Sequence, residues 1–161
     1  MKGATLTERE HTAGSAVLCR VGARICAVPT EHVSETMRPL PIEPLAGMPA
    51  FVLGVSRIRG VPTPVIDAAR MLGAKDPCQH ARFVRLTMGS RAAALAVDGV
   101  IGVVAIDAMP LSELPLLLRD ADTEVIDAIG TQDAELLLVL RAARIAPPSV
   151  WSTLDERKTS R

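Results

Sequence analysis

Cys78 and His80 are the two residues whose types and spacing most directly suggest chemistry. A thiolate and an imidazole two positions apart can bind one metal ion, or can act together as a nucleophile and its base. A structural zinc site normally has four ligands, and the other cysteines and histidines show no matching spacing: Cys19, Cys26, His11 and His32. Cysteine catalysis also needs a third, orienting group. We therefore expect neither a metal site nor a catalytic site here.

Two further groupings of polar or small residues have ordinary explanations. Glu31 and Glu35 lie four positions apart, which on a helix places both carboxylates on one face for acid–base work. Such pairs are usually a solvated helix face. Gly99 and Gly102 in "DGVIG" lack the G-x-G-x-x-G spacing before a helix that cradles phosphates. We expect no enzyme activity and no cofactor.

Arg57 and Arg59, in "GVSRIRGVPTPVID", are a better indication of function. On a strand, residues two apart face the same side, so both guanidinium groups would leave one surface of a sheet together. Arginine is a favoured interface residue, and a partner-binding patch is our preferred interpretation over a solvated sheet face. Pro62 and Pro64 remove alternate amides from one edge, which limits pairing with a further strand.

Composition bounds the class of protein. The 161 residues suit one domain, and 18 acidic side chains balance 18 basic ones, so a nucleic-acid partner is not expected. Three cysteines, an odd number, and the lack of a signal segment or long apolar span predict a cytoplasmic protein with reduced thiols and no membrane insertion. Only three aromatic residues occur, so the core must be aliphatic.

Short β-branched runs separated by turn residues predict most of the secondary structure. Gly22-Ala23 and Gly89-Ser90 each join two such runs as a hairpin. The remaining predicted strands flank Arg59-Gly60 or stand alone near the C-terminus, at 52–58, 61–67 and 134–140. Many short strands with little long helix indicate a mostly β, barrel-like architecture.

Other segments are predicted as follows. Residues 29–37 fit one or two helical turns with Thr30 as N-cap, and the four prolines of 38–51 predict an irregular connection. Residues 67–73 fit a short helix with Asp67 near its start, whereas 75–80 predict an exposed loop. Asp98-Gly99 either turns the chain or forms a bulge in a long bent strand. Residues 112–130 remain ambiguous between a strand edge and irregular coil.

The domain boundaries follow from these elements. We expect a flexible N-terminal tail over 1–14, one domain over 15–151 and a polar C-terminal tail over 152–161. A short helix around Trp151 leads into this last tail. Because Trp151 is the only tryptophan of an aromatic-poor chain, we expect it to dock on the core.

The segment "MPAFVLGVSRIRGVPTPVID" resembles the P-x-F-I-x-G-V-x-N-L-R-G-x-x-x-P-V-x-D core of the CheW-like family, the adaptor domains of bacterial chemosensory arrays. The segments "AVLCRVGARICAVP", "EHVSETM", "LAVDGVIGVVAI" and "ELLLVLRAARI" occur in the family's order, so the resemblance covers about residues 15–146. It implies the CheW-like fold, which is two five-stranded SH3-like β-barrels around a shared hydrophobic core with short helices, and no catalysis.

The resemblance also implies a function. The family couples transmembrane chemoreceptors to the CheA histidine kinase and pairs with the kinase's own related regulatory domain. This chain would then bind the regulatory domain of a CheA-type kinase and the cytoplasmic tip of a chemoreceptor, at membrane-associated receptor arrays. The alternative is a CheW-like regulatory or small-ligand-sensing domain in a pilus-motility or developmental pathway, with different partners.

Site residues are carried over by motif position. Arg59 occupies the arginine of "L-R-G", which is implicated in kinase and receptor contacts, and Val33 and Glu35 match the Val-x-Glu positions near the receptor-binding groove. Arg57 stands where the family usually has asparagine, so we expect it to bear on this chain's own choice of partner. Four further motif positions are expected to be structural: Gly54, Gly60, Asp67 and Asp98.

Overall fold

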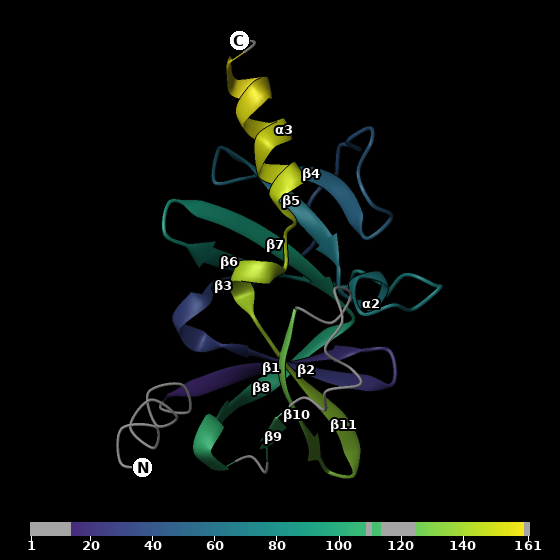
Figure 1. The fold of residues 1–161 in the computed structure, drawn as a ribbon, viewed down its shortest axis with the longest axis vertical. Helices are drawn as coiled ribbons and strands as arrows, with labels where there is room; N and C mark the ends of the chain where they lie inside the picture. The colour runs from purple at the N-terminus through teal and green to yellow at the C-terminus, as the bar shows by residue number, and fades with distance from the viewer. Residues whose placement is uncertain (1–13, 109–110, 114–124, 160–161) are drawn as a thin grey trace.

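The structure is a computed structural model that describes residues 14–108, 111–113 and 125–159. Its described strands form two sheets, which lie one above the other along the long axis of the molecule (Figure 1). The order of the six-stranded sheet is β8-β1-β2-β11-β10-β9, with bounds Gly99–Ala105, Ser15–Val21, Arg24–Pro29, Glu135–Leu140, Ile126–Gln132 and Leu111–Glu113. The order of the five-stranded sheet is β3-β6-β7-β5-β4, with bounds Val33–Met37, Arg82–Met88, Arg91–Val97, Val61–Asp67 and Val52–Ile58.

The expected mostly-β fold with two joined units is confirmed. One sheet has six strands and not five, because it ends on the three-residue strand β9. Among the described residues, the strand pairings leave both sheets with two unpaired edges, so neither closes into a barrel through its ladder. Within the described residues, the two α-helices are short: α2 over Ala68–Met71 and α3 over Pro148–Thr159.

One hydrophobic core is shared by the two sheets. Successive residues of β1 point to opposite faces, so Val17, Cys19 and Val21 enter the shared core while Leu18 joins a smaller cluster behind the sheet. Strands of the second sheet contribute Val65, Leu95 and other aliphatic residues to the same shared core. The core is therefore aliphatic, as the composition predicts, and it fixes the two sheets against one another.

The predicted helix over 29–37 is wrong beyond its first turn. Thr30–His32 form one 3₁₀ turn, and Val33–Met37 form β3, which pairs with β6. The Thr30 hydroxyl donates to the carbonyl of Ser15 at 3.0 Å and does not cap the turn. Pairing with a neighbouring strand outweighs the local capping pattern here, because the half-buried β-branched residue Val33 suits a sheet surface.

Asp98 marks the place where the chain changes sheets. β7 pairs with β5 and β6, whereas β8 pairs with β1 in the other sheet. The predicted hairpin turn at Asp98-Gly99 is therefore wrong, and the competing interpretation of one long bent strand is closer to what is seen. The register of β8 against β1 shifts between Leu18 and Cys19.

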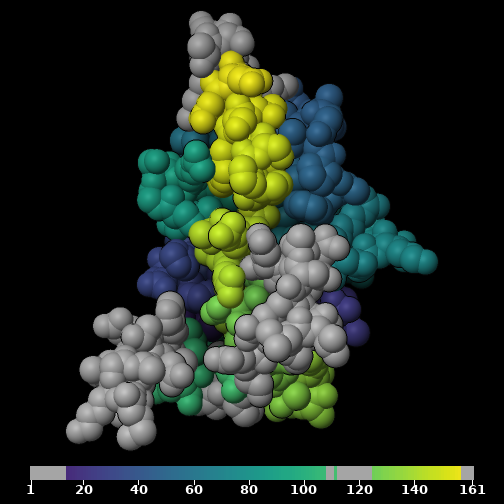
Figure 2. Space-filling view, in the orientation of Figure 1, coloured from purple at the N-terminus to yellow at the C-terminus, as the bar shows by residue number. Residues whose placement is uncertain are grey.

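The C-terminal helix α3 stands out from the body beside the five-stranded sheet (Figures 1 and 2). Trp151 is partly buried against the shared core, as expected, and the guanidinium of Arg91 lies 5.1 Å from the centre of its ring. The helix continues to Thr159 through residues expected to form a polar tail. In the described part of the chain, no helix is both long and apolar enough to cross a membrane.

Candidate functional site

Arg59 lies at a hairpin turn and not on a strand. Ile58 pairs with Val61, so Arg59 and Gly60 form a two-residue connection between β4 and β5. Their φ angles are +52° and +77°, as the type I′ turn of such hairpins requires. The expectation that Arg57 and Arg59 leave one strand face together is therefore wrong, because the turn redirects the second side chain.

The guanidinium of Arg59 makes a two-bond contact with the carboxylate of Glu35. Its Nε donates to Oε2 at 2.6 Å and its Nη2 donates to Oε1 at 3.1 Å. The Arg59 side chain is 69% exposed and that of Glu35 is 24% exposed. These hydrogen bonds from Arg59, together with its charge, hold the pKa of Glu35 below its ordinary value. The structure thus joins two residues that the sequence assigned to separate motifs.

The surroundings of Glu35 bring in one residue that the sequence did not single out. Arg85 on β6 pairs with Glu35 across the ladder, and its charge also lowers the pKa of that carboxyl. Its Nη1 lies 3.0 Å from the Ser34 hydroxyl. Val33, which lies on β3 with Glu35, is partly buried against the core. Only the cross-strand register, which the sequence does not reveal, places Arg85 here.

Arg57 lies apart from this pair. It is exposed on β4, opposite Pro62, and its guanidinium makes no ion pair among the described residues. It lines a surface pocket of about 280 Å³ together with Arg85 and Arg91, and α3 contributes Trp151 to the same pocket. The pocket therefore brings three arginines and an indole ring together with two acidic residues, Glu43 and Asp155.

The two prolines of β5 occupy an unusual place. β5 is an inner strand between β4 and β7, so the prediction that Pro62 and Pro64 cap a sheet edge is only partly correct. Both pair with β4, whereas the pairing with β7 is confined to Val65, Ile66 and Asp67. Missing amides are tolerated in the first half of β5 because that half has no partner on its other side.

Gly54 has a backbone position that excludes a side chain. Its φ is +142°, and a Cβ atom built there would lie 2.1 Å from the carbonyl oxygen of Glu43. That close approach arises because Glu43 and Val55 exchange two backbone hydrogen bonds of 2.8 Å. Glycine is therefore what lets the proline-rich connection pack on β4.

Asp98 holds the junction between the sheets. Its carboxylate accepts a hydrogen bond of 2.6 Å from the backbone N–H of Gly22, in the β1–β2 turn, and another from the N–H of Gln79. One side chain thus ties a turn of the six-stranded sheet to the loop before β6. These contacts support the structural role expected for Asp98.

Asp67 gathers the loop that carries Cys78 and His80. Its fully buried carboxylate caps α2 by accepting from the N–H of Arg70 at 2.9 Å, accepts from the N–H of Cys78 at 3.2 Å and contacts Nε2 of His80. Cys78 is itself buried, so the prediction of a wholly exposed loop is wrong at this residue. The sequence missed this cluster because Asp67 is distant from Cys78 along the chain.

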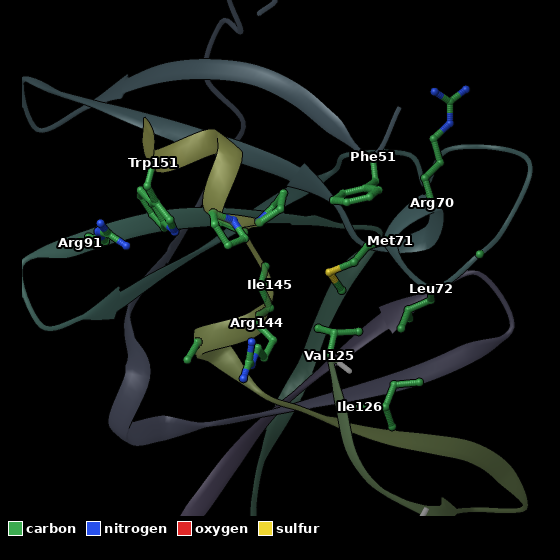
Figure 3. A pocket seen from close by; sticks show the side chains of 15 residues that line it. Phe51, Arg70, Met71, Leu72, Arg91, Val125, Ile126, Arg144, Ile145 and Trp151 are labelled. Atoms are coloured by element: carbon green, nitrogen blue, oxygen red, sulfur yellow. The ribbon is translucent and has the colours of Figure 1, made fainter. Parts of the chain in front are cut away.

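A second pocket lies where the two sheets and α3 meet. It has a volume of about 510 Å³, and Figure 3 shows Phe51 and Met71 on one side of it and Val125 on the other. The guanidinium of Arg70 points away from the hollow (Figure 3). The lining is mainly apolar, which is the usual character of a small-molecule site.

These features describe a small mostly-β domain that exposes an arginine–glutamate pair. Residues 15–147 match the family described as the CheW-like domain, and the chain belongs to this family. It is 36% identical over 128 residues to Protein FrzA of Myxococcus xanthus, and this alignment covers 74% of this chain and 78% of that protein. It is 24% identical over 130 residues to the Chemotaxis protein CheW of Rhizobium meliloti, and this alignment covers 80% of this chain and 84% of that protein.

A solved structure has the same fold. The crystal structure of the scaffolding protein TtCheW from Thermoanaerobacter tengcongensis matches with a TM-score of 0.68 and 22% sequence identity. The match covers 80% of this chain and 89% of that one. The resemblance in the central motif is thus confirmed as family membership, and membership of a family of coupling and scaffolding proteins supports a chemosensory adaptor role.

Proposed function

We propose that this chain is a non-enzymatic adaptor that couples chemoreceptors to a CheA-type histidine kinase in the cytoplasm. The observation that carries the proposal is the family match over 15–147, which includes the motif arginine displayed on the surface. The relative from Rhizobium meliloti is named a chemotaxis protein, and the matched structure is described as a scaffolding protein. The partners proposed are the kinase's regulatory domain and the cytoplasmic tip of a receptor.

The Arg59–Glu35 pair suits a contact surface for a physical reason. Glu35 engages two of the five guanidinium N–H donors, at Nε and Nη2, and leaves others for a partner. The two-bond contact also fixes the orientation of a long side chain before binding. Less side-chain entropy is then lost when an interface forms.

Val33 and Arg57 extend the proposed surface in different ways. Val33 lies two residues from Glu35 on the edge strand β3 and supplies partly exposed apolar area. Arg57 lines the pocket beside Trp151, together with Glu43 and Asp155. We propose that Arg57 selects a partner with an acidic group facing this pocket, because an added charge can reject one surface and favour another.

Individual contacts need not be strong. An array repeats each contact many times, so that simultaneous engagement multiplies modest affinities. The four site residues that we propose for contact lie on the edge strands or at the hairpin end of one sheet. Weak single contacts within a large assembly are therefore the expected regime.

The alternative is a sensing domain that binds a small molecule, and the 510 Å³ pocket between the sheets favours it. A melting-temperature screen of the purified chain against metabolites tests it, alongside a binding assay with the kinase regulatory domain and a receptor-tip fragment. The adaptor predicts saturable binding to both protein partners and no metabolite-dependent shift. A saturable metabolite shift without binding to either protein would replace the adaptor with the sensor.

A further inference from the structure

Three different ligand atoms meet at the end of β5. Asp67 ends that strand, and Cys78 and His80 come from the loop between α2 and β6. One carboxylate oxygen, the Cys78 sulfur and one ring nitrogen of His80 lie within 4.8 Å of one another. Asp67 is completely buried and Cys78 nearly so, whereas the His80 side chain is 27% exposed. The cluster is therefore enclosed but accessible through the imidazole.

The contacts of Asp67 leave its negative charge to be balanced. Its hydrogen bonds from the N–H groups of Arg70 and Cys78 come from neutral donors, and the imidazole of His80 is its remaining contact. A carboxylate buried this deeply is normally paired with a cation or coordinates a metal. A cation bound at this cluster would supply the balancing charge.

We propose that Asp67, Cys78 and His80 bind one Zn²⁺ ion, with water as the fourth ligand. Thiolate, imidazole and carboxylate are the donors that zinc takes in proteins, and three protein ligands with one open position are a common arrangement. The partial exposure of His80 would give water access to this fourth position. The proposal depends on this chain's own geometry and not on the partners of the adaptor.

The donors are held by contacts outside the cluster. Two backbone N–H groups orient the Asp67 carboxylate, and Asp98 holds the loop through the N–H of Gln79. His80 has a φ of +54°, a left-handed conformation that non-glycine residues rarely adopt. The same residue contacts Asp67 through its imidazole. Such outer contacts are what orient the ligands of metal sites.

Zinc binding would remove the proton of the Cys78 thiol. The Cys78 thiol donates to the carbonyl of Ala96 at 3.1 Å, and burial raises its pKa above the ordinary value. Zinc would take the thiolate, release this proton to solvent and break that hydrogen bond. It would also bind the ring nitrogen of His80 that now contacts Asp67, so metal coordination would replace that contact. Affinity should therefore fall as the pH is lowered.

The competing interpretation is a metal-free clamp in which His80 hydrogen-bonds Asp67 and the thiol stays neutral. Titration of the full chain, first treated with a chelator, separates the two. We expect one Zn²⁺ per chain, a rise in melting temperature with zinc, and a thiolate-to-cobalt charge-transfer band when Co²⁺ replaces zinc. No binding at micromolar zinc, or cobalt binding without that band, would overturn the proposal.

Variants assign the site. Cys78→Ser should abolish the charge-transfer band, and His80→Ala should weaken zinc binding by about a hundredfold, at least the loss seen when outer contacts of metal sites are removed. The matched controls are Cys26→Ala and His32→Ala, which remove a cysteine and a histidine outside the cluster. Melting of each metal-free variant shows that it folds. Equal zinc affinity in His80→Ala and His32→Ala would contradict the assignment.

Discussion

Glu35 on β3 and Arg59 in the β4–β5 turn join the two edge strands of the five-stranded sheet. These strands lie at opposite ends of the strand order, so the sheet must curl for the two side chains to meet. The contact therefore depends on the curvature of the sheet, and it leaves the guanidinium of Arg59 largely exposed. It brings the Val-x-Glu motif and the L-R-G motif together on one surface.

The pKa of Glu35 provides a test of this pairing. Hydrogen bonds from Arg59 lower it in the folded protein, so the pair stabilises the fold above the ordinary glutamate pKa, and this stabilisation is lost as the pH falls through the lowered value. NMR titration of the Glu35 carboxyl should show its pKa returning toward the ordinary value in Arg59→Ala. An unchanged pKa in that variant would show that the contact does not persist in solution.

Gly54→Ala should destabilise the protein strongly. The new Cβ would overlap the carbonyl of Glu43, and the backbone would keep an unfavourable φ, so we expect a loss of about 3 kcal/mol, near the upper end for backbone strain. Gly99→Ala is the matched control, because no atom lies within 4 Å of its Cβ position. Chemical denaturation measures both. Similar losses for the two variants would contradict the packing described here.

Asp98→Ala should weaken the junction between the sheets. It removes the acceptor for the N–H groups of Gly22 and Gln79, and the loss of such charged acceptors costs about 2 kcal/mol. Asp107→Ala, at an exposed position of a 3₁₀ turn, is the control and should change stability by about 0.5 kcal/mol or less. Urea unfolding of both variants compares them directly, and equal midpoints would refute the role given to Asp98.

Arg57→Asn should change partner preference and leave the fold intact. The side chain is exposed and makes no ion pair among the described residues, so its removal breaks no described internal contact. If Arg57 selects its partner, the variant should lose affinity for this chain's own kinase domain and gain affinity for that of an unrelated chemotaxis system. Competition binding with the two domains measures this. An unchanged ratio of affinities would leave Arg57 without the proposed role.

Local sequence patterns predict most of the strands well. They fail where the structure of a segment depends on pairing with a strand that is distant in the sequence. The hairpins at Gly22-Ala23 and Gly89-Ser90 follow from turn residues between apolar runs, and both are observed. The segment Val33–Met37 follows a helix-capping signal at Thr30, but pairing with β6 makes it a strand. Asp98 has the appearance of a turn residue, yet the chain passes there from one sheet to the other.

The candidate site likewise combines residues that the sequence identifies with contacts that only the fold creates. The family motif singles out Arg59 and Glu35 in the sequence, but only the curled sheet brings them into contact. Arg85 joins them through strand register, and Asp67 joins Cys78 and His80 through the packing of a loop. None of these three relationships corresponds to a local spacing. Periodicity and turn chemistry therefore leave them undetermined.

The most direct measurement is the affinity of the purified chain for the regulatory domain of a CheA-type kinase, compared with Arg59→Ala. We expect saturable binding by the native chain and about thirtyfold weaker binding by the variant, the effect of losing an interface arginine worth about 2 kcal/mol. Melting should be nearly unchanged, because Arg59 is mostly exposed. Arg82→Ala, exposed on the same sheet, should bind normally. Equal affinity of Arg59→Ala and the native chain would contradict the proposed adaptor surface.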